Sequence, residues 1–264
     1  MNRALVLLPL FVFGCASKLP VDRTDDGIEG GESTTADPAV GWLGYTSGGR
    51  FVEDCTGTLI APDVVLTAGH CTLDTASMRF FVTTNADGTT TSHPTAKVIT
   101  FPGFFFHACP EAQDEPDVGL VQLATPIADI APLRLATPAP VAVGDVCRIV
   151  GFGGHTNDAG QQSSGPKRSA TSSVIAVDAK TITVTAGTGI ATHGDSGGPL
   201  FDGERIAGVV SCHTDGEVPS HKIEYYTPLS SKAMDWMQST MTIWATPGST
   251  ATSDPDASAP RTTP

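Results

Sequence analysis

The chain has 264 residues, of which 40% are apolar and 16% are charged, and this composition excludes an intrinsically disordered protein. Its 28 glycines and 20 prolines argue against a helical bundle or a coiled coil, and its length allows one or two domains with a substantial core. The formal net charge of −13 repels phosphate backbones, so we expect no nucleic-acid binding. Beyond the N-terminus, no apolar run reaches the roughly 20 residues that a membrane-spanning helix needs.

The N-terminus has the pattern of a secretory signal. A basic residue precedes the almost wholly apolar residues 4–14, and Cys15 follows them. Residues 12–15 resemble a bacterial lipobox, which predicts an exported bacterial protein that carries a lipid on Cys15. The alternative is ordinary cleavage after Ala16, and in both cases residues 1–16 are a signal peptide. We therefore expect a secreted or cell-envelope protein, in a compartment where disulfides persist.

Two further segments are expected to lie outside the fold. Residues 17–27 have the composition of a polar linker or propeptide. Residues 246–264 consist almost entirely of Pro, Ser, Thr, Ala, Gly and Asp. Such a tail cannot bury enough apolar surface to offset the entropy lost on ordering, so we expect it to be disordered. The fold is then expected within residues 28–245.

Within these limits, short β-rich runs are separated by turn residues. Residues 181–185 alternate between apolar and hydroxyl side chains, which is typical of a half-buried strand. Similar runs contain residues 118–120 and 206–210, and the turn signals include Asp87-Gly88 and Asp202-Gly203. The pattern predicts an all-β sandwich or barrel.

One helix is expected near the C-terminus. Ser230 or Ser231 can cap its first turn. Apolar residues then recur at helical spacing, namely Leu229, Ala233, Trp236, Met237 and Met241. We expect this apolar face to pack on the core.

Three segments carry residue types that nucleophilic catalysis requires. Residues 194–199, Gly-Asp-Ser-Gly-Gly-Pro, place Ser196 in a turn whose main-chain N–H groups can converge on one point. His70 follows an apolar run, and a serine needs such a base to take its proton. Asp117 begins an apolar strand, where a buried carboxylate needs a donor such as an imidazole N–H. Alone, the serine segment favours catalysis over a simple turn, whereas a histidine or a strand-end aspartate such as His70 or Asp117 is more often structural.

Together, and in the order His, Asp, Ser, the three segments resemble the trypsin/chymotrypsin family of serine proteases. The resemblance extends over about residues 28–241. It implies an all-β fold of two six-stranded antiparallel barrels with a C-terminal helix. The first barrel is expected at about residues 28–135 and the second at about residues 136–245.

The resemblance also implies a serine-type endopeptidase that forms an acyl-enzyme. In this interpretation Ser196 attacks the peptide carbonyl, His70 transfers the proton, and Asp117 holds His70 in the correct tautomer. The N–H groups of Gly194 and Ser196 would form the oxyanion hole. We expect a monomer that acts on protein or peptide substrates, with a lipid anchor to a membrane if Cys15 is modified.

In the resembled family, the residue before the serine pairs with a new N-terminus after cleavage of a zymogen. Here Asp195 would pair with Ile28, which opens a family-like start in which Glu29 is a departure. The cut would fall after Gly27, and the acidic residues before that glycine argue against trypsin-like self-cleavage. Such a cut would also detach a lipid on Cys15, so activation without cleavage remains an alternative.

Six cysteines raise the question of pairing. The resemblance implies a disulfide between Cys55 and Cys71. Cys147 lacks its usual family partner, so Cys109–Cys212 and Cys147–Cys212 both remain open, and one thiol is left over. No paired Cys/His spacing supports a zinc site, and we expect no metal and no cofactor.

Substrate specificity departs from that of trypsin. Ile190 takes the position of trypsin's basic-selective aspartate, which predicts a preference for a small or apolar residue before the cut. Glu224 either offers a carboxylate to a basic substrate or points into solvent beside Lys222. Ser211 and His213 are expected on the edge strand that pairs with extended substrate, where His213 can also narrow the pocket.

The same residues are compatible with two alternatives to a trypsin-like protease. Residues 194–198 also match the G-x-S-x-G motif of α/β-hydrolase esterases, which would need a histidine after the serine, either His213 or His221. The strand-rich body and the upstream His70 oppose that interpretation. The other alternative is a protease-like surface binding protein without activity, which the unusual N-terminus and pocket favour.

Overall fold

The computed structural model describes residues 27–47, 50–109, 111, 113–136, 141–156, 162–164, 166–214 and 222–246. The predicted signal peptide with Cys15, residues 17–26 of the predicted linker and residues 247–264 of the predicted tail lie outside the described residues. None of the helices in the described ranges has the length and apolarity that crossing a membrane demands.

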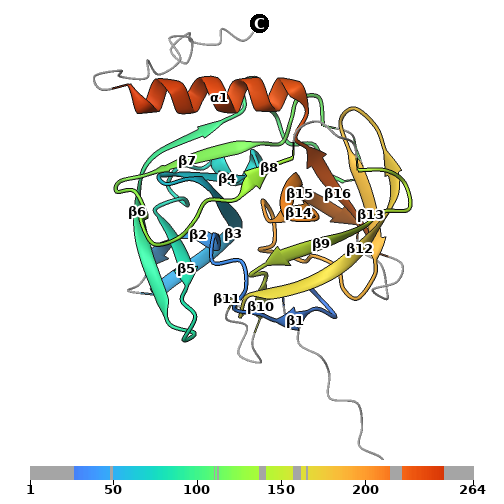
Figure 1. Cartoon of the computed structure of the whole chain (residues 1–264), viewed down its shortest axis with the longest axis horizontal. Coiled ribbons are helices and arrows are strands. Elements are labelled where there is room, and N and C mark those ends of the chain that lie inside the picture. Colours follow the sequence, from blue (N-terminus) through green and yellow to red (C-terminus); the bar gives the residue numbers. More distant parts are fainter. Residues whose placement is uncertain are drawn as a thin grey trace, which may run out of the picture.

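Six strands form the first barrel, which closes in the order β2, β3, β4, β7, β6, β5 (Figure 1). Their bounds are Val40–Ser47 for β2, Arg50–Ala61 for β3, Val64–Thr67 for β4, Phe80–Thr84 for β5, Thr90–Thr100 for β6 and Gly119–Leu123 for β7. A single 3-10 turn, η1 at His70–Thr72, follows β4. The predicted turn at Asp87-Gly88 joins β5 to β6, where Gly88 has a φ of 83° that favours glycine.

The second barrel contains six strands in the order β12, β13, β16, β15, β14, β9, and a β12–β9 pairing closes the ring. Their bounds are Val146–Gly151 for β9, Arg168–Val177 for β12, Ile182–Ala186 for β13, Pro199–Asp202 for β14, Arg205–Thr214 for β15 and Ile223–Pro228 for β16. A separate hairpin joins β10, Gly154–Thr156, to β11, Gln162–Ser164. The predicted fold class of two six-stranded antiparallel barrels is confirmed.

The part of the chain that is expected to form the first barrel contains two short strands that pair instead with strands of the second barrel. Strand β1, Glu32–Ser33, adds to β12, and β8, Arg134–Leu135, runs parallel to β15. The chain therefore touches the second sheet just before it enters the first barrel and again just after it leaves it. All-β barrels of this kind exclude the α/β-hydrolase interpretation, which requires helices between parallel strands.

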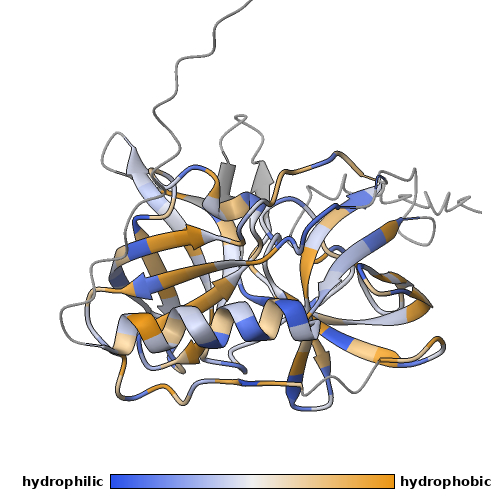
Figure 2. Ribbon diagram, turned by 90° about the horizontal axis from the view of Figure 1, so that it is seen from above, coloured by the Kyte–Doolittle hydropathy of each residue, from blue (hydrophilic) through white to orange (hydrophobic). Residues whose placement is uncertain are grey.

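The predicted helix is α1, Ser231–Ala245, which lies across one end of the molecule over β7 (Figure 1). The Ser230 hydroxyl caps it by accepting the Ala233 N–H at 3.3 Å. Polar and apolar residues alternate along the helix (Figure 2), and its buried positions include Ala233, Met237 and Thr240. Capping and apolar spacing thus place the helix where the sequence predicts it.

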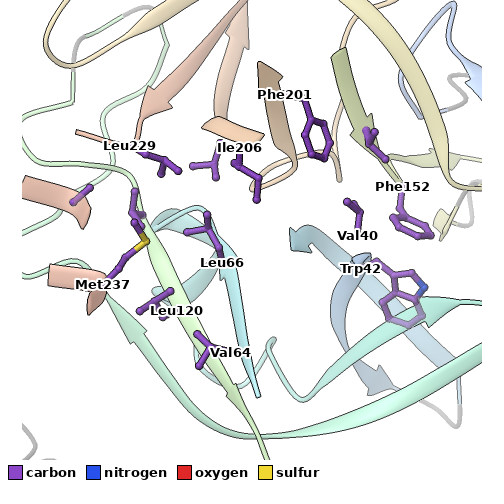
Figure 3. Packing of buried hydrophobic residues seen from close by; sticks show 14 of the residues in the cluster. Val40, Trp42, Val64, Leu66, Leu120, Phe152, Phe201, Ile206, Leu229 and Met237 are labelled. Atoms are coloured by element: carbon purple, nitrogen blue, oxygen red, sulfur yellow. The ribbon is translucent and has the colours of Figure 1, made fainter. Parts of the chain in front are cut away.

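An apolar cluster joins the two barrels (Figure 3). The first barrel contributes Val40, Trp42, Val64, Leu66 and Leu120, and the second contributes Val150, Phe152, Phe201, Ile206 and Val209. Leu229, just before α1, and Ala233 and Met237 within α1 complete the cluster. Because protein interiors are close-packed and resist shear, this cluster fixes the barrels relative to each other. Side chains contributed by different barrels can therefore meet in a defined geometry.

Candidate active site

His70 and Asp117 meet because their strands are neighbours. His70 opens η1 three residues after the end of β4, and Asp117 lies two residues before β7, which pairs with β4. The His70 Nδ1–H donates to Asp117 Oδ2 at 2.8 Å, and the His70 backbone N–H donates to Asp117 Oδ1 at 2.7 Å. Two donors from one residue hold both the position and the ring orientation of the histidine.

The Asp117 carboxylate receives a third hydrogen bond from the other barrel. The Ser211 hydroxyl, on β15, donates to Asp117 Oδ2 at 2.6 Å. Asp117 is fully buried, and a buried carboxylate is stable only when donors satisfy it. Sequence reasoning placed Ser211 on the substrate edge and missed this contact with the acid.

Main-chain contacts place Ser196 beside the end of β4. Its carbonyl oxygen accepts the Thr56 N–H at 2.8 Å and lies 3.8 Å from the sulfur of Cys71, the residue after His70. Gly197 has a φ of 79°, and a Cβ there would lie 2.1 Å from Thr67 Oγ1. This close approach requires glycine and brings the serine turn against the segment that carries His70. Both Ser196 and His70 stay partly exposed, as groups that meet a substrate must be.

The turn before Ser196 presents main-chain N–H groups. Gly194 has a φ of 91°, and its carbonyl accepts the Thr56 hydroxyl at 2.9 Å, so that carbonyl points inward. Within the described parts of the chain, the N–H groups of Gly194 and Ser196 donate to no protein acceptor. Two unpaired donors on alternate residues of a tight turn can stabilise a developing oxyanion.

Asp195 is buried beneath this turn. Its Oδ2 accepts the N–H groups of Ile28 at 3.0 Å and Thr192 at 2.8 Å, and its Oδ1 accepts that of Gly153 at 2.7 Å. Burial raises the pKa of this carboxyl, and the three main-chain donors oppose the rise. A Cβ on Gly151 would lie 2.0 Å from Oδ1, so the carboxyl fills a space that only glycine leaves open.

The backbone at Ile28 is strained. Ile28 has a φ of 40°, which is rare for a β-branched residue. Gly27 passes so close to the second barrel that a Cβ on it would lie 2.3 Å from the Gly153 carbonyl oxygen. In the continuous chain, the Ile28 N–H therefore reaches the Asp195 carboxylate only with an unfavourable φ at Ile28 and with glycine at position 27.

The predicted specificity residues Ile190 and Glu224 are both fully buried. Ile190 forms an isolated bridge with Glu29, whose carbonyl accepts its N–H at 3.0 Å. The alternative in which Glu224 points into solvent beside Lys222 is wrong, because Glu224 Oε2 accepts the Tyr226 hydroxyl at 2.7 Å and Lys222 pairs with Glu29 instead. Side chains two apart share one face of β16, and Tyr226 occupies the buried face.

Aromatic rings border the site in a way that the sequence did not reveal. The Phe106 ring lies 5.0 Å from the His70 ring, measured between centroids. His193 and His213 also lie 5.0 Å apart, edge to face. His213, predicted on the substrate edge, therefore stands with a second histidine next to the serine turn. The Phe-Phe-Phe run at residues 104–106 is the one sequence signal that could have pointed to an aromatic wall.

The structure decides the cysteine pairing. Cys55 is joined to Cys71, and Cys109 is joined to Cys212, so the alternative Cys147–Cys212 pairing is wrong. Cys147 is a free, buried thiol whose pKa is raised to about 11 by burial and, secondarily, by nearby carboxylates. The second disulfide ties the loop before Asp117 to the substrate edge on β15, a link between the barrels.

Potential metal ligands gather at one place among the described residues. Cys55, His70 and Cys71 have ligand atoms within 4.8 Å of one another. Both cysteines are in a disulfide, and a disulfide sulfur is not the thiolate that zinc requires. This group is therefore a poor metal site.

Loss of the Cys55–Cys71 disulfide is expected to destabilise the fold. The bond closes a loop of 16 positions, and the chain-entropy estimate for such a loop is ~3 kcal/mol. The Cys55→Ser/Cys71→Ser variant should lose about this much free energy of unfolding in urea under non-reducing conditions. An unchanged unfolding midpoint would show that the crosslink does not restrict the unfolded chain.

Comparison with known proteins agrees with this geometry. Residues 28–237 match the trypsin family. The chain is 30% identical to "Alpha-fibrinogenase albofibrase" of Trimeresurus albolabris over 227 residues. This aligned region covers 74% of this chain and 79% of that protein. It is 32% identical over 204 residues to "Snake venom serine protease HS114" of Bothrops jararaca, with 66% and 72% covered. "Thrombin-like enzyme CPI-enzyme 2" of Gloydius ussuriensis is 33% identical over 174 residues, 60% of this chain and 66% of that enzyme. The chain therefore belongs to the trypsin family of chymotrypsin-like serine endopeptidases.

Proposed function

We propose that this protein hydrolyses peptide bonds with Ser196 as nucleophile, His70 as general base and acid, and Asp117 as the group that orients His70. Ser196 attacks the carbonyl and forms an acyl-enzyme while its proton moves to His70. His70 then protonates the leaving amine, and water releases the acyl group by the reverse sequence. The N–H groups of Gly194 and Ser196 stabilise the oxyanion in both steps.

One observation carries this proposal: the bidentate hold of buried Asp117 on His70. Because the Nδ1–H of His70 is committed to Asp117 at 2.8 Å, the free lone pair of the neutral ring is on Nε2, on the other side of the ring. That nitrogen is available to a serine whose turn packs against the same strand end. A structural histidine would not need an oriented, partly exposed ring beside such a turn.

Protein or peptide segments are the proposed substrates, bound by a monomer. Ser211 and His213 lie on β15 beside the serine turn and supply the edge along which an extended substrate can add as a strand. The buried isoleucine at position 190 supports a preference for small or apolar residues before the cut. The inactive binding-protein alternative has the weaker support, because a buried acid orients His70 and the turn that carries Ser196 packs against the same strand end.

We also propose that cleavage before Ile28 activates the enzyme. In the continuous chain a neutral amide faces the Asp195 carboxylate, whereas a cut turns that nitrogen into an α-ammonium group that can pair with it. The cut also removes the strained φ of 40°, since an N-terminal residue has no φ dihedral.

A preparation that begins at Ile28 should therefore hydrolyse peptides about 100- to 1000-fold faster than one that retains residues 17–27. The cut replaces the neutral amide and the strained φ at Ile28 with an α-ammonium group that holds Asp195 in place, and the oxyanion hole depends on that placement. Comparison of kcat for the two preparations measures this, and Asp195→Asn should remove most of the difference. Equal rates would show that activation needs no cut.

Export is proposed on separate grounds. The apolar N-terminal segment and the two disulfides fit a protein that leaves the cytoplasm, and one of the relatives described above is a snake venom serine protease by name. A lipid on Cys15 and a bacterial origin rest on the lipobox-like segment alone. Metabolic labelling with a fatty-acid analogue tests for the lipid. The Cys15→Ser variant should not be labelled.

A fluorophosphonate probe tests the proposed function directly. Such probes phosphonylate a serine, with loss of fluoride, only when its base and oxyanion donors are assembled. We expect a single labelled serine, mapped by mass spectrometry to Ser196, together with cleavage of a peptide library. Labelling that survives in His70→Ala would contradict the assignment of the base.

A further inference from the structure

The Cys109–Cys212 disulfide joins the two barrels beside the candidate active site. Cys109 belongs to the loop of residues 101–118 between β6 and β7, and Cys212 lies on β15. Both cysteines are partly exposed, whereas Cys55 and Cys71 of the other disulfide are buried. Thiol–disulfide exchange requires access to a sulfur, so a reductant reaches the Cys109–Cys212 bond more readily than the buried one.

On β15, the disulfide adjoins the residue that supports Asp117. Ser211 immediately precedes Cys212, and its hydroxyl donates to Asp117 Oδ2 at 2.6 Å. The β15–β16 register shifts between Val210 and Cys212, so Ser211 falls in a β-bulge. A bulge re-aims a side chain but interrupts the local ladder of hydrogen bonds. The disulfide therefore adds a covalent restraint at the point where the ladder is interrupted.

On the loop, the disulfide lies close in sequence to the aromatic wall of the site. Cys109 comes three residues after Phe106, whose ring lies 5.0 Å from the His70 ring. Gln113 closes this part of the loop on itself. Its side-chain oxygen accepts the His107 N–H at 2.9 Å, and its side-chain NH₂ donates to the His107 carbonyl at 2.6 Å. These bonds involve neither cysteine, so the loop should keep its own shape when the disulfide is cleaved.

Near the disulfide, open space separates the loop from β15. A cavity of about 140 Å³ is lined by Glu111 and Gln113 of the loop and by Ser211 and Cys212 of β15. Close packing is what normally prevents two segments from moving relative to each other. At this place the disulfide supplies the restraint that packing supplies in the apolar cluster between the barrels (Figure 3).

We propose that the Cys109–Cys212 disulfide is a redox-controlled positioning element for catalysis. The inference rests on the proposed function, because it concerns the placement of the proposed triad and substrate edge. While the bond is intact, it holds the loop with Phe106 and the β15 edge at a fixed separation across the site. When the bond is reduced, the loop and the edge can move apart, while the apolar cluster keeps the barrels together.

A dithiol is the class of reductant that this step requires. One of its thiolates attacks a sulfur of the bond, forms a mixed disulfide and releases the other cysteine. The second thiol of the reductant then attacks the reductant's sulfur in the mixed disulfide and displaces the remaining cysteine. The products are two protein thiols and a cyclic disulfide, so two electrons and two protons pass to the protein. Burial raises the pKa of Cys147 to about 11, so this free thiol stays protonated and does not act as a competing nucleophile.

The test measures kcat/KM for a preparation that begins at Ile28, at different ratios of reduced to oxidised dithiothreitol. Reduction should lower kcat/KM for an extended peptide, which pairs with the β15 edge, by roughly 10- to 100-fold. A single-residue ester does not use that edge, so its turnover should change far less. Alkylation and mass spectrometry should find new thiols at Cys109 and Cys212 and none at Cys55 or Cys71. Oxidised dithiothreitol should restore the original activity.

Variants separate positioning from a general loss of stability. Cys109→Ser/Cys212→Ser should show the peptide-to-ester ratio of the reduced parent protein in both redox conditions. Cys147→Ser is the matched control, and it should keep the redox response of the parent because Cys147 is a free thiol. The reduced parent provides the same comparison without any substitution, and fluorophosphonate labelling of Ser196 verifies that its nucleophile stays active.

The failures of the two proposals are distinguishable. An unchanged peptide-to-ester ratio after Cys109 and Cys212 have been reduced would overturn the positioning role. A loss of activity that appears only when Cys55 and Cys71 are also alkylated would overturn it too, because that loss would reflect unfolding. Absence of both labelling and turnover in the oxidised preparation would overturn the proposed function itself.

Discussion

Ser196→Ala is expected to lower kcat by about 10⁶-fold, the scale of loss when a serine nucleophile is removed from a triad. The physical reason is that alanine offers no atom that can form the acyl-enzyme, whereas the oxyanion donors and the substrate edge stay in place. A residual rate above that of the uncatalysed reaction should therefore remain. Measurement of kcat with a peptide ester and a peptide amide, together with loss of fluorophosphonate labelling, checks the result.

The dependence on His70 provides the control for this prediction. Because serine and histidine act as one unit, His70→Ala should cost about as much as Ser196→Ala, and the double variant should cost little more. Additive losses would indicate that the two residues act independently. Undiminished turnover in Ser196→Ala would remove the nucleophile assignment altogether.

The sequence allowed the barrels and the helix to be predicted because their signals are local. The alternation at residues 181–185 reflects a strand with one buried face, which is β13. Ser230 and the apolar spacing after it mark the start of α1 because a cap and an amphipathic face are properties of adjacent residues. The family motifs around His70, Asp117 and Ser196 supplied the long-range order.

Contacts between segments distant in the chain were harder to predict. The Cys109–Cys212 bond spans 103 positions, and spacing alone left two pairings open. The hydroxyl of Ser211 reaches Asp117 only because the two barrels pack together, so no periodicity could show that bond. Both features depend on tertiary packing.

For Glu224, two sequence signals conflict: the strand period predicts burial, and the charge predicts exposure. Its burial follows from the two-residue period of β16, in which it shares a face with Tyr226, so the sequence did contain the signal. A charged residue is nevertheless expected on an exposed face, and this prior favoured solvent beside Lys222. Within the fold, the Tyr226 hydroxyl partly compensates for the burial by donating to Glu224 Oε2 at 2.7 Å.

Asp117→Asn is expected to lower kcat by about 10⁴-fold while leaving the fold intact. The arrangement of donors explains why. The His70 backbone N–H at the Oδ1 position can only donate, so the amide oxygen of asparagine must face it. The amide NH₂ then occupies the Oδ2 position and donates to His70 Nδ1. This forces the imidazole proton onto Nε2, where it blocks transfer from Ser196.

The tautomer itself can be measured. Nitrogen NMR of the His70 ring should show the proton on Nδ1 in the parent protein and on Nε2 in Asp117→Asn. Asp63→Asn is the matched control, because it makes the same chemical change away from the site. Like Asp117, Asp63 accepts a side-chain hydrogen bond, here from Gln122. Ser211→Ala should reduce kcat far less, by about tenfold, since it removes one donor to Oδ2 and leaves the tautomer correct. If Asp117→Asn retained kcat within tenfold, the bond between Asp117 and His70 would be structural, and catalysis would not depend on the orientation that it imposes.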